Sequence, residues 1–260
     1  MTRLDVWLTE NGLAESREKA QALVMAGRVR IDGAPASKPG VRVREASAVL
    51  VDPGPAHVGR GARKLAGALD VFGVDPAGRV AVDVGASTGG FTETLLARGA
   101  RRVYAVDVGR GQLHERLRTD PRVVVRDRTN ARTLSAAEVP EPCSLAAVDV
   151  AFISVTRILP ALRSVLAPGA EAVVLVKPQF EVGRRQVGRG GIVKEPALHR
   201  DALRTVATAA QALGYAIVEV CASPVLGAEG NREFFLHLVR EGAPLGADAL
   251  EEHFRKAVGP

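Results

Sequence analysis

The chain has 260 residues, of which 47% are hydrophobic, and it carries a formal net charge of +6. This length accommodates one large domain and a small one. The sequence contains no uncharged apolar run of about eighteen residues, the length that crosses a membrane. Its first eight residues include an aspartate where a secretion signal is apolar, so we expect a cytoplasmic protein.

The two cysteines and five histidines indicate no metal site. Cys143 and Cys221 are too few for a disulfide framework or a zinc site, and we interpret each as a small buried residue beside an expected strand. The histidines form no His-x-x-x-His pair. We therefore expect no metal.

Arginine dominates the positive charge. Residues 98–132 hold ten arginines and four acids, an excess of six that equals the excess of the whole chain. A planar guanidinium binds two phosphate oxygens at once. This pattern favours a polyanionic partner, with an ordinary solvated surface as the alternative.

The first fifty residues are expected to form a small α+β unit. Apolar spacing and turn signals predict two helices and three short strands, over residues 3–10, 17–25, 29–31, 41–43 and 49–51. The phrase Ser-Arg-x-x-Ala-x-x-Leu-x-x-x-Gly-x-Val-x-Ile-Asp-Gly from Ser16 resembles the small RNA-binding domain shared with ribosomal small-subunit protein four. The basic side chains assigned to RNA binding are Arg3, Arg17, Lys19, Arg28 and Arg30. The alternative is a unit that only covers the larger domain.

A Pro- and Gly-rich break at residues 52–55 separates this unit from the larger domain. We place the small domain at residues 1–58, a linker at 59–63 and the larger domain at 64–260, with its first helix beginning at Lys64. Seven strands alternate with helices, over residues 80–82, 103–106, 122–125, 145–149, 172–177, 216–221 and 233–239. The predicted fold class is α/β: a Rossmann-like, seven-stranded, mostly parallel sheet covered on both faces, with a small amino-terminal α+β domain.

The strand over residues 80–82 leads into a glycine-rich loop, after which a helix is expected from Thr92. Gly85, Gly89 and Gly90 would let a ligand approach bare backbone. The spacing is neither Gly-x-Gly-x-x-Gly nor that of a phosphate loop, and no lysine follows. An adenosine with an amino-acid tail fits better, which points to S-adenosylmethionine. Another nucleotide, or a turn without ligand, is the alternative.

Asp107 closes the next strand about twenty residues after the start of the glycine loop. From this position an acidic residue binds ribose hydroxyls in dinucleotide folds. The residues assigned to cofactor binding are Asp83, Gly85, Ala86, Ser87, Thr88, Gly89, Gly90, Phe91, Asp107, Asn130 and Asp149.

Four charged residues are expected at the edge where a parallel sheet exposes its active site. Asp149 and Lys177 end two strands, Glu233 opens the last strand, and Lys64 begins the first helix of the larger domain. A lysine at the end of an apolar strand is costly to bury without a partner, and Asp149 and Glu233 are the evident partners of Lys177. Each residue alone could be an ordinary ion-paired group, but together with the glycine loop they indicate a catalytic site.

Residues 183–194 form a glycine- and arginine-rich segment directly after the strand that ends in Lys177. Active-site loops gather at this end of a parallel sheet. We assign its Arg184, Arg185 and Arg189 to RNA binding. The segment is interpreted as a lid over the substrate or, alternatively, as a mobile surface turn.

Six motifs along the chain resemble the TlyA family. They are Gly-Ala-Ser-Thr-Gly-Gly-Phe-Thr from Gly85, Asp-Val-Gly-x-Gly-Gln-Leu from Asp107, Arg-Thr-Asn-Ala-Arg from Arg128, Phe-Ile-Ser from Phe152, Leu-Val-Lys-Pro-Gln-Phe-Glu-Val-Gly from Leu175 and Gly-Asn-x-Glu-Phe-Phe-Leu from Gly230. The resemblance implies an FtsJ-like methyltransferase that uses S-adenosylmethionine to methylate the 2′-hydroxyl of cytidine in ribosomal RNA. It also implies a Lys-Asp-Lys-Glu tetrad, which maps onto Lys64, Asp149, Lys177 and Glu233.

The chemistry agrees with this tetrad. A ribose hydroxyl is a poor nucleophile and a sulfonium methyl is already activated, so the enzyme must align the two and help to remove one proton. We assign Lys177 as the base or as the group that orients the hydroxyl. The alternatives are a non-catalytic RNA-binding or ribosome-assembly factor, and the membrane-active haemolysin that the family's other name suggests, which the lack of an apolar span disfavours.

Overall fold

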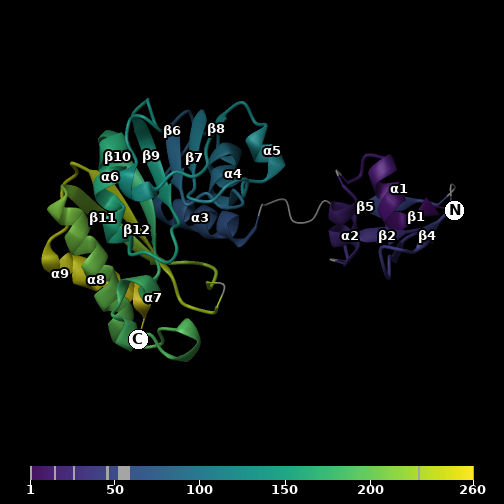
Figure 1. The fold of residues 1–260 in the computed structure, drawn as a ribbon. Helices are drawn as coiled ribbons and strands as arrows, with labels where there is room; N and C mark the ends of the chain where they lie inside the picture. The colour runs from purple at the N-terminus through teal and green to yellow at the C-terminus, as the bar shows by residue number, and fades with distance from the viewer. Residues whose placement is uncertain are drawn as a thin grey trace. The chain divides into compact units, whose positions relative to one another are not determined.

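The computed structural model describes residues 2–14, 16–25, 27–44, 47–51, 59–227 and 229–259, without the side chains of Glu18, Lys19 and Ala22. The chain divides into two compact units, Met1–Ala56 and His57–Pro260. Each unit has its own hydrophobic core (Figure 1).

The first unit packs two helices against short strands. Its elements are β1 (Thr2–Arg3), α1 (Leu4–Glu10), α2 (Arg17–Met25), β2 (Val29–Ile31), β3 (Ala34–Pro35), β4 (Arg42–Val43) and β5 (Val49–Val51). β1 pairs with β4, and β2 lies between β3 and β5. Leu4 and Leu8 lie one turn apart on α1 and are buried together with Val24 and Val29. The expected helices and strands are confirmed, and the two-residue strands β1 and β3 are additional.

The second unit is built on a seven-stranded sheet. Its strands are β6 (Val80–Val84), β7 (Arg102–Val106), β8 (Val123–Arg126), β9 (Cys143–Val148), β10 (Leu166–Val176), β11 (Tyr215–Ala222) and β12 (Phe234–Arg240). The strand order is β11-β12-β10-β9-β6-β7-β8. β12 runs antiparallel to both of its neighbours, whereas β10, β9, β6, β7 and β8 pair in parallel. The predicted seven-stranded, mostly parallel sheet is confirmed.

Helices cover both faces of this sheet (Figure 1). They are α3 (Gly59–Phe72), α4 (Gly90–Ala97), α5 (Glu115–Arg118), α6 (Leu159–Val165), α7 (Pro178–Glu181), α8 (Pro196–Ala212) and α9 (Ala247–Val258), and the short 3-10 turns are η1 (Ala131–Thr133), η2 (Val155–Arg157), η3 (Arg184–Gln186) and η4 (Arg189–Gly191). Alternate residues of β6 face opposite layers: Val82 belongs to the core that includes α6, α8 and α9, and Ala81 to the core that includes α3 and α4. This is the three-layer arrangement that alternating strands and helices predict.

Helix α3 corrects one expectation. It begins at Gly59, so residues 59–63 are helical rather than a linker, and Lys64 lies in the second turn instead of at the helix start. Glycines at 59 and 61 disfavour a helix by intrinsic propensity. Tertiary contacts compensate for this, because the Thr94 hydroxyl of α4 donates to the Ala62 carbonyl at 3.1 Å and the Phe91 ring lies beside Gly61.

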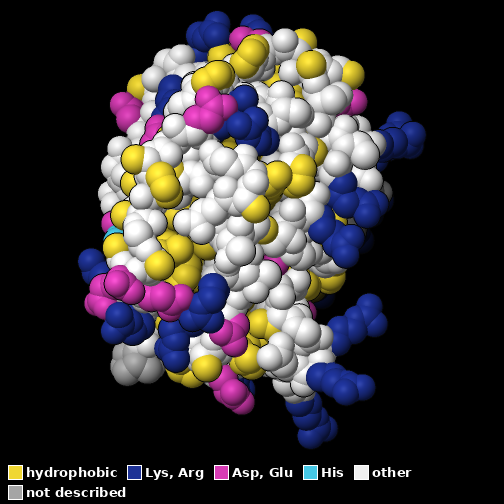
Figure 2. Space-filling view, turned by 90° about the vertical axis from the view of Figure 1, so that its left-hand side faces the viewer, with side chains coloured by type: hydrophobic (Ala, Val, Ile, Leu, Met, Phe, Trp, Pro, Cys, Tyr) yellow, Lys and Arg dark blue, Asp and Glu magenta, His cyan; other side chains and the backbone are white. Residues whose placement is uncertain are grey.

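The face that carries β11, α8 and α9 has acidic and basic side chains intermixed, with small apolar patches between them (Figure 2). Arg204 on α8, for example, donates to Glu251 on α9 at 2.7 Å and also pairs with Asp201. Charges of both signs neutralise one another on these two helices.

Candidate active site

The glycine loop joins β6 to α4 with three residues in the left-handed region. These are Gly85 (φ 89°), Ser87 (φ 48°) and Gly89 (φ 103°). A Cβ on Gly85 would lie 2.2 Å from the carbonyl oxygen of Asp149, so the loop rests directly on the end of β9. A Cβ on Gly89 would lie 2.2 Å from Cδ1 of Leu117. Gly89 is thus required by its positive φ and by the leucine side chains beside its Cα, and its contact with a ligand stays a prediction.

Two adjacent pockets open at the carboxyl ends of β6, β7 and β9. One, of about 490 Å³, is lined by residues that include Gly85, Asp107, Asn130, Asp149 and Phe152. The other, of about 120 Å³, is lined by Arg60, Gly61, Gly85, Ala86, Ser87, Thr88, Gly90, Phe91 and Asp149. Together they bring to one place every residue assigned to the cofactor except Asp83 and Gly89.

Asp107 is tied to the glycine loop. One of its carboxylate oxygens accepts from the backbone N–H of Ser87 at 2.8 Å, and the other accepts from that of Gly109 at 2.7 Å. Each carboxylate oxygen has a further lone pair for a ligand hydroxyl. The strand end, the loop and the acceptor are therefore one connected element on the wall of the larger pocket.

Asp83 lies behind the loop and not on a pocket wall. It is completely buried, its Oδ2 accepts from the Thr92 hydroxyl at 2.6 Å, and its Oδ1 meets no donor within the described residues. Burial raises the pKa of Asp83 to about 7, against the Thr92 hydrogen bond and with a further contribution from the charge of Asp149. The structure thus gives Asp83 contacts that hold α4 to β6, in place of the expected position at the ligand.

The four charged residues meet at this edge as two ion pairs. Val176 pairs with Phe234 in the sheet, which sets Lys177 beside the antiparallel start of β12. Nζ of Lys177 lies 2.5 Å from Oδ1 of Asp149, and Nζ of Lys64 donates to Oε2 of Glu233 at 2.5 Å. The expectation that Asp149 partners Lys177 holds, but Glu233 partners Lys64 instead.

The two pairs differ in exposure. The side chains of Lys64 and Glu233 are 9% and 3% exposed, whereas those of Lys177 and Asp149 are 12% and 22% exposed. Asp149 also lines both pockets. The Lys177–Asp149 pair thus reaches the pockets through Asp149, whereas neither Lys64 nor Glu233 lines them.

Phe152 was not assigned a role from the sequence, although it belongs to one of the six motifs. Its side chain is 92% exposed, its φ is 64°, and its ring lies 5.5 Å from that of Phe180. It also lines the larger pocket, three residues after Asp149. An exposed aromatic ring in a left-handed backbone conformation is costly for folding alone. The structure therefore indicates a functional position at Phe152, and the signal in the sequence is its place in the Phe-Ile-Ser motif.

The arginines assigned to RNA binding differ in their surroundings. Arg184, Arg185 and Arg189 are exposed on the turns η3 and η4. In the first unit, Arg3 and Arg17 are about half exposed and both donate to the buried carboxylate of Asp5 at 3.0 Å.

The hydrogen bonds from Arg3 and Arg17 hold the pKa of Asp5 far below its ordinary value. Arg30 is exposed and donates to the Gly33 carbonyl, Arg28 is half-buried, and the side chain of Lys19 lies outside the described residues. Arg3 and Arg17 therefore have a structural contact in addition to any contact with RNA.

The described ranges contain neither a metal site nor a membrane-spanning helix. They contain no group of three or more His, Cys, Asp or Glu side chains arranged to hold a metal ion. None of the helices described in either unit has the length and apolar character needed to cross a membrane.

Comparison with known proteins identifies the class. Residues 57–240 match the FtsJ-like methyltransferase family, and residues 2–49 match the S4 domain. An S-adenosylmethionine-dependent methyltransferase from Mesorhizobium loti shares the fold, with a TM-score of 0.50 at 16% identity over 67% of this chain and 96% of that one. The larger unit therefore has the fold of S-adenosylmethionine-dependent methyltransferases.

Two further relatives are similar over almost the whole chain. The 16S/23S rRNA (cytidine-2′-O)-methyltransferase TlyA of Mycobacterium tuberculosis is 49% identical over 98% of this chain and 97% of its own length. A solved structure from Streptococcus thermophilus has a TM-score of 0.74 at 39% identity, covering 98% of this chain and 94% of that one. The chain belongs to the TlyA family of FtsJ-like methyltransferases.

Proposed function

We propose that this protein transfers a methyl group from S-adenosylmethionine to the 2′-hydroxyl of cytidine in ribosomal RNA. The observation that carries the proposal is that Asp149, on the wall of the pocket that also contains Gly85 and Asp107, forms an ion pair with Lys177 at 2.5 Å. The name of the Mycobacterium tuberculosis relative supports the same reaction and substrate.

The residues around the larger pocket fit S-adenosylmethionine. Its volume of about 490 Å³ is in the range of small-molecule sites. Asp107 offers acceptors for ribose hydroxyls, and the apolar Val108 and Ile158 on the same wall suit a flat base. The N–H groups of Gly85 and Ser87 already donate to Val106 and Asp107, so the loop would offer its carbonyl oxygens to the ammonium group of the amino-acid tail. The bound cofactor would supply an activated methyl group on a sulfonium.

The protein's own residues would align the ribose hydroxyl and handle its proton. Asp149 holds the Lys177 amine at the pocket, so that amine either accepts the hydroxyl proton or orients the hydroxyl oxygen. Lys64 and Glu233, nearly closed to solvent, fix the start of β12 next to Lys177. The exposed ring of Phe152 offers a face on which a base of single-stranded RNA can stack.

RNA binding is assigned to both units. The exposed arginines of η3 and η4 and the S4 domain of the first unit carry groups that contact phosphates. Contacts of this kind release counterions, so affinity for ribosomal RNA is expected to fall steeply with salt.

The test is single-turnover methyl transfer to ribosomal RNA with saturating cofactor, with the modified nucleotide mapped. Lys177→Ala should lower the rate by about 10²-fold or more, the range of a lost general base, while cofactor and RNA affinity stay close to wild type. Lys177→Arg should not restore the rate, because a guanidinium keeps its proton near neutral pH.

Two outcomes would contradict the proposal. Absence of 2′-O-methyl product from the wild-type protein, with RNA binding intact, would favour the alternative of a non-catalytic RNA-binding or assembly factor. A Lys177→Ala rate equal to wild type would remove this residue from the mechanism and shift the role to Lys64.

A further inference from the structure

The segment that carries Arg184, Arg185 and Arg189 is held at both ends. We define residues 182–192, between α7 and the buried Val193, as the basic loop. It contains three arginines and no acid. Within it, Gln186 accepts from the Gly183 N–H at 2.9 Å, and the Gly188 N–H donates to the Ile192 carbonyl at 3.0 Å. These bonds give the loop a defined shape of its own.

The entrance of the basic loop is fixed by Glu181. Its carboxylate accepts from the Ser154 hydroxyl at 2.5 Å and from the Val155 N–H at 2.8 Å. Burial raises the pKa of Glu181 against both of these bonds. Ser154 and Val155 follow Asp149 by only a few residues, so the loop entrance is joined to the segment that carries the catalytic aspartate.

The exit of the basic loop is fixed by two side chains that are each 1% exposed, Asn231 and His199. Oδ1 of Asn231 accepts from the Val193 N–H at 2.9 Å, and its Nδ2 donates to the Gly191 carbonyl at 2.9 Å. Nε2 of His199 lies 2.9 Å from the Val193 carbonyl oxygen. The N–H and the carbonyl of Val193 thus each contact a buried side chain. Asn231 lies two residues before Glu233 in the sequence.

We propose that Glu181 and Asn231 are positioning residues, which hold the basic loop in a fixed place relative to the tetrad so that its arginines meet the phosphates next to the reacting nucleotide. The inference deepens the proposed function and rests on it for the identity of the RNA. The loop starts five residues after Lys177, its entrance is bonded to the Asp149 segment, and its exit is bonded to the Glu233 segment. A preformed loop does not have to be ordered when RNA binds, which favours affinity.

The first test needs no RNA. Trypsin cleaves after arginine, and the basic loop contains three arginines. The hydrogen bonds at its entrance and exit restrain the loop and should slow this cleavage. Asn231→Ala leaves the Val193 N–H and the Gly191 carbonyl without their partner, so cleavage after Arg184, Arg185 and Arg189 should be about tenfold faster, read by mass spectrometry. Asn11→Ala, the same change at an exposed position of the first unit, should leave these cleavage rates unchanged.

The second test uses RNA and separates positioning from a general loss of structure. Asn231→Ala should raise KM for ribosomal RNA by about tenfold while kcat and cofactor affinity change by less than about threefold. In a background of Arg184→Gln, Arg185→Gln and Arg189→Gln the same change should raise KM no further, because its effect passes through those arginines. An equal rise in KM in both backgrounds would overturn the proposal.

Glu181→Gln provides the second variant in case Asn231→Ala does not fold. Its amide oxygen can replace the carboxylate for one donor only, so cleavage in the loop and KM should rise in the same direction. The matched control is Glu138→Gln, since Glu138 also accepts from a serine hydroxyl and a backbone N–H, both of Ser135, away from the loop. Faster cleavage with unchanged RNA affinity would refute the role in RNA binding, and failure of the wild-type protein to bind ribosomal RNA would refute the proposed function instead.

Discussion

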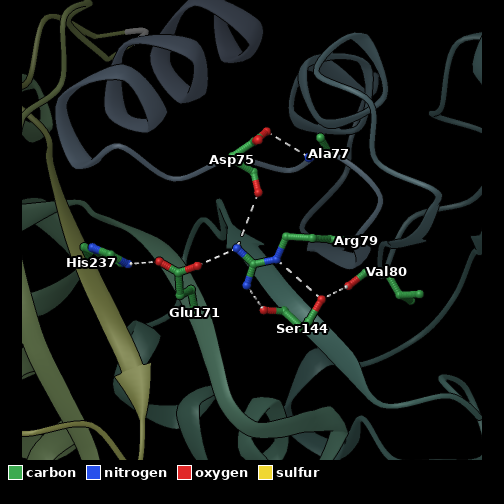
Figure 3. Close-up of polar contacts among 7 residues, drawn as sticks. All are labelled: Asp75, Ala77, Arg79, Val80, Ser144, Glu171 and His237. Atoms are coloured by element: carbon green, nitrogen blue, oxygen red, sulfur yellow. Dashed lines mark hydrogen bonds and ion pairs between the residues drawn. The ribbon is translucent and has the colours of Figure 1, made fainter.

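Charged side chains from several strands gather both where the parallel strands end, the carboxyl edge of the large sheet, and where these strands begin, the opposite edge. The two groups differ in what they contact. At the carboxyl edge, Asp149 lines a pocket and forms an ion pair with Lys177. At the opposite edge, Arg79 lies between Glu171 of β10 and Ser144 of β9 (Figure 3). Glu171 in turn accepts from His237 of β12, with Nε2 at 2.8 Å.

The side chains at the opposite edge form hydrogen bonds with one another and with nearby backbone carbonyls. The Arg79 guanidinium donates to the Glu171 carboxylate, the Ser144 carbonyl and hydroxyl, and the Asp75 carbonyl (Figure 3). None of these residues lines the two pockets at the carboxyl edge. A cluster of charged side chains therefore indicates a functional site only where it also borders space for a ligand.

The largest effect is expected for the deep pair at the carboxyl edge. Lys64→Met should lower the free energy of unfolding by about 3–5 kcal/mol, because it leaves the Glu233 carboxylate buried without its cation. Adding Glu233→Leu should restore much of that loss, since the double variant contains no isolated buried charge. Urea unfolding of the two variants measures this, and a double variant less stable than Lys64→Met would contradict it.

A smaller and pH-dependent effect is expected for Asp83, behind the glycine loop. Its folded-state pKa, about 7, lies above its ordinary value of 3.8, so the folded protein binds more protons than the unfolded chain between these values. Stability from this group should therefore fall as the pH rises from about 4 to about 7. Asp83→Asn removes the titration, so its stability relative to wild type should improve over that interval in urea unfolding. A constant difference would show that Asp83 does not titrate there.

The smallest effect is expected at the opposite edge, and it has the opposite sign. The hydrogen bond from His237, with the Arg79 contact, lowers the pKa of Glu171 from 4.5 to about 2. Its stabilisation should be present above pH 4.5 and be lost as the pH falls toward 2.

Glu171→Gln should therefore be less stable than wild type at pH 7, by an amount that shrinks as the pH is lowered through this range. Its methyl-transfer rate at pH 7 should stay within about threefold of wild type, because the residue lies at the edge away from the pocket. A rate loss like that of Lys177→Ala would break the distinction between the two edges.

The sequence predicted the carboxyl edge well because its residues are tied to strand ends. Asp107, Asp149 and Lys177 each follow an apolar run, and parallel strands bring such positions together whatever the connections between them. The partner of each lysine was harder to predict. The start of β12 reaches this edge only because β12 runs antiparallel, and whether Glu233 bonds Lys177 or Lys64 depends on where α3 packs.

The opposite edge could not be predicted from the sequence. Arg79 and Glu171 are 92 positions apart, and each sits at an ordinary place in a strand or turn. The same limit applies to the contact of Gly89 with Leu117, which leaves no room for a side chain at position 89, and to the exit of the basic loop. In each case the partner comes from a distant segment, so local spacing contains no signal of it.

The position of β12 has a consequence for how the protein is made. It follows the other described strands in chain order, yet it lies inside the sheet, where it joins β11 to β10. Until residues 233–240 have left the translating ribosome, β11 is separated from the sheet and Lys64 lacks Glu233. The strands made before β12 can thus form the glycine loop, whereas the ion pair between Lys64 and Glu233 has to wait until β12 has emerged.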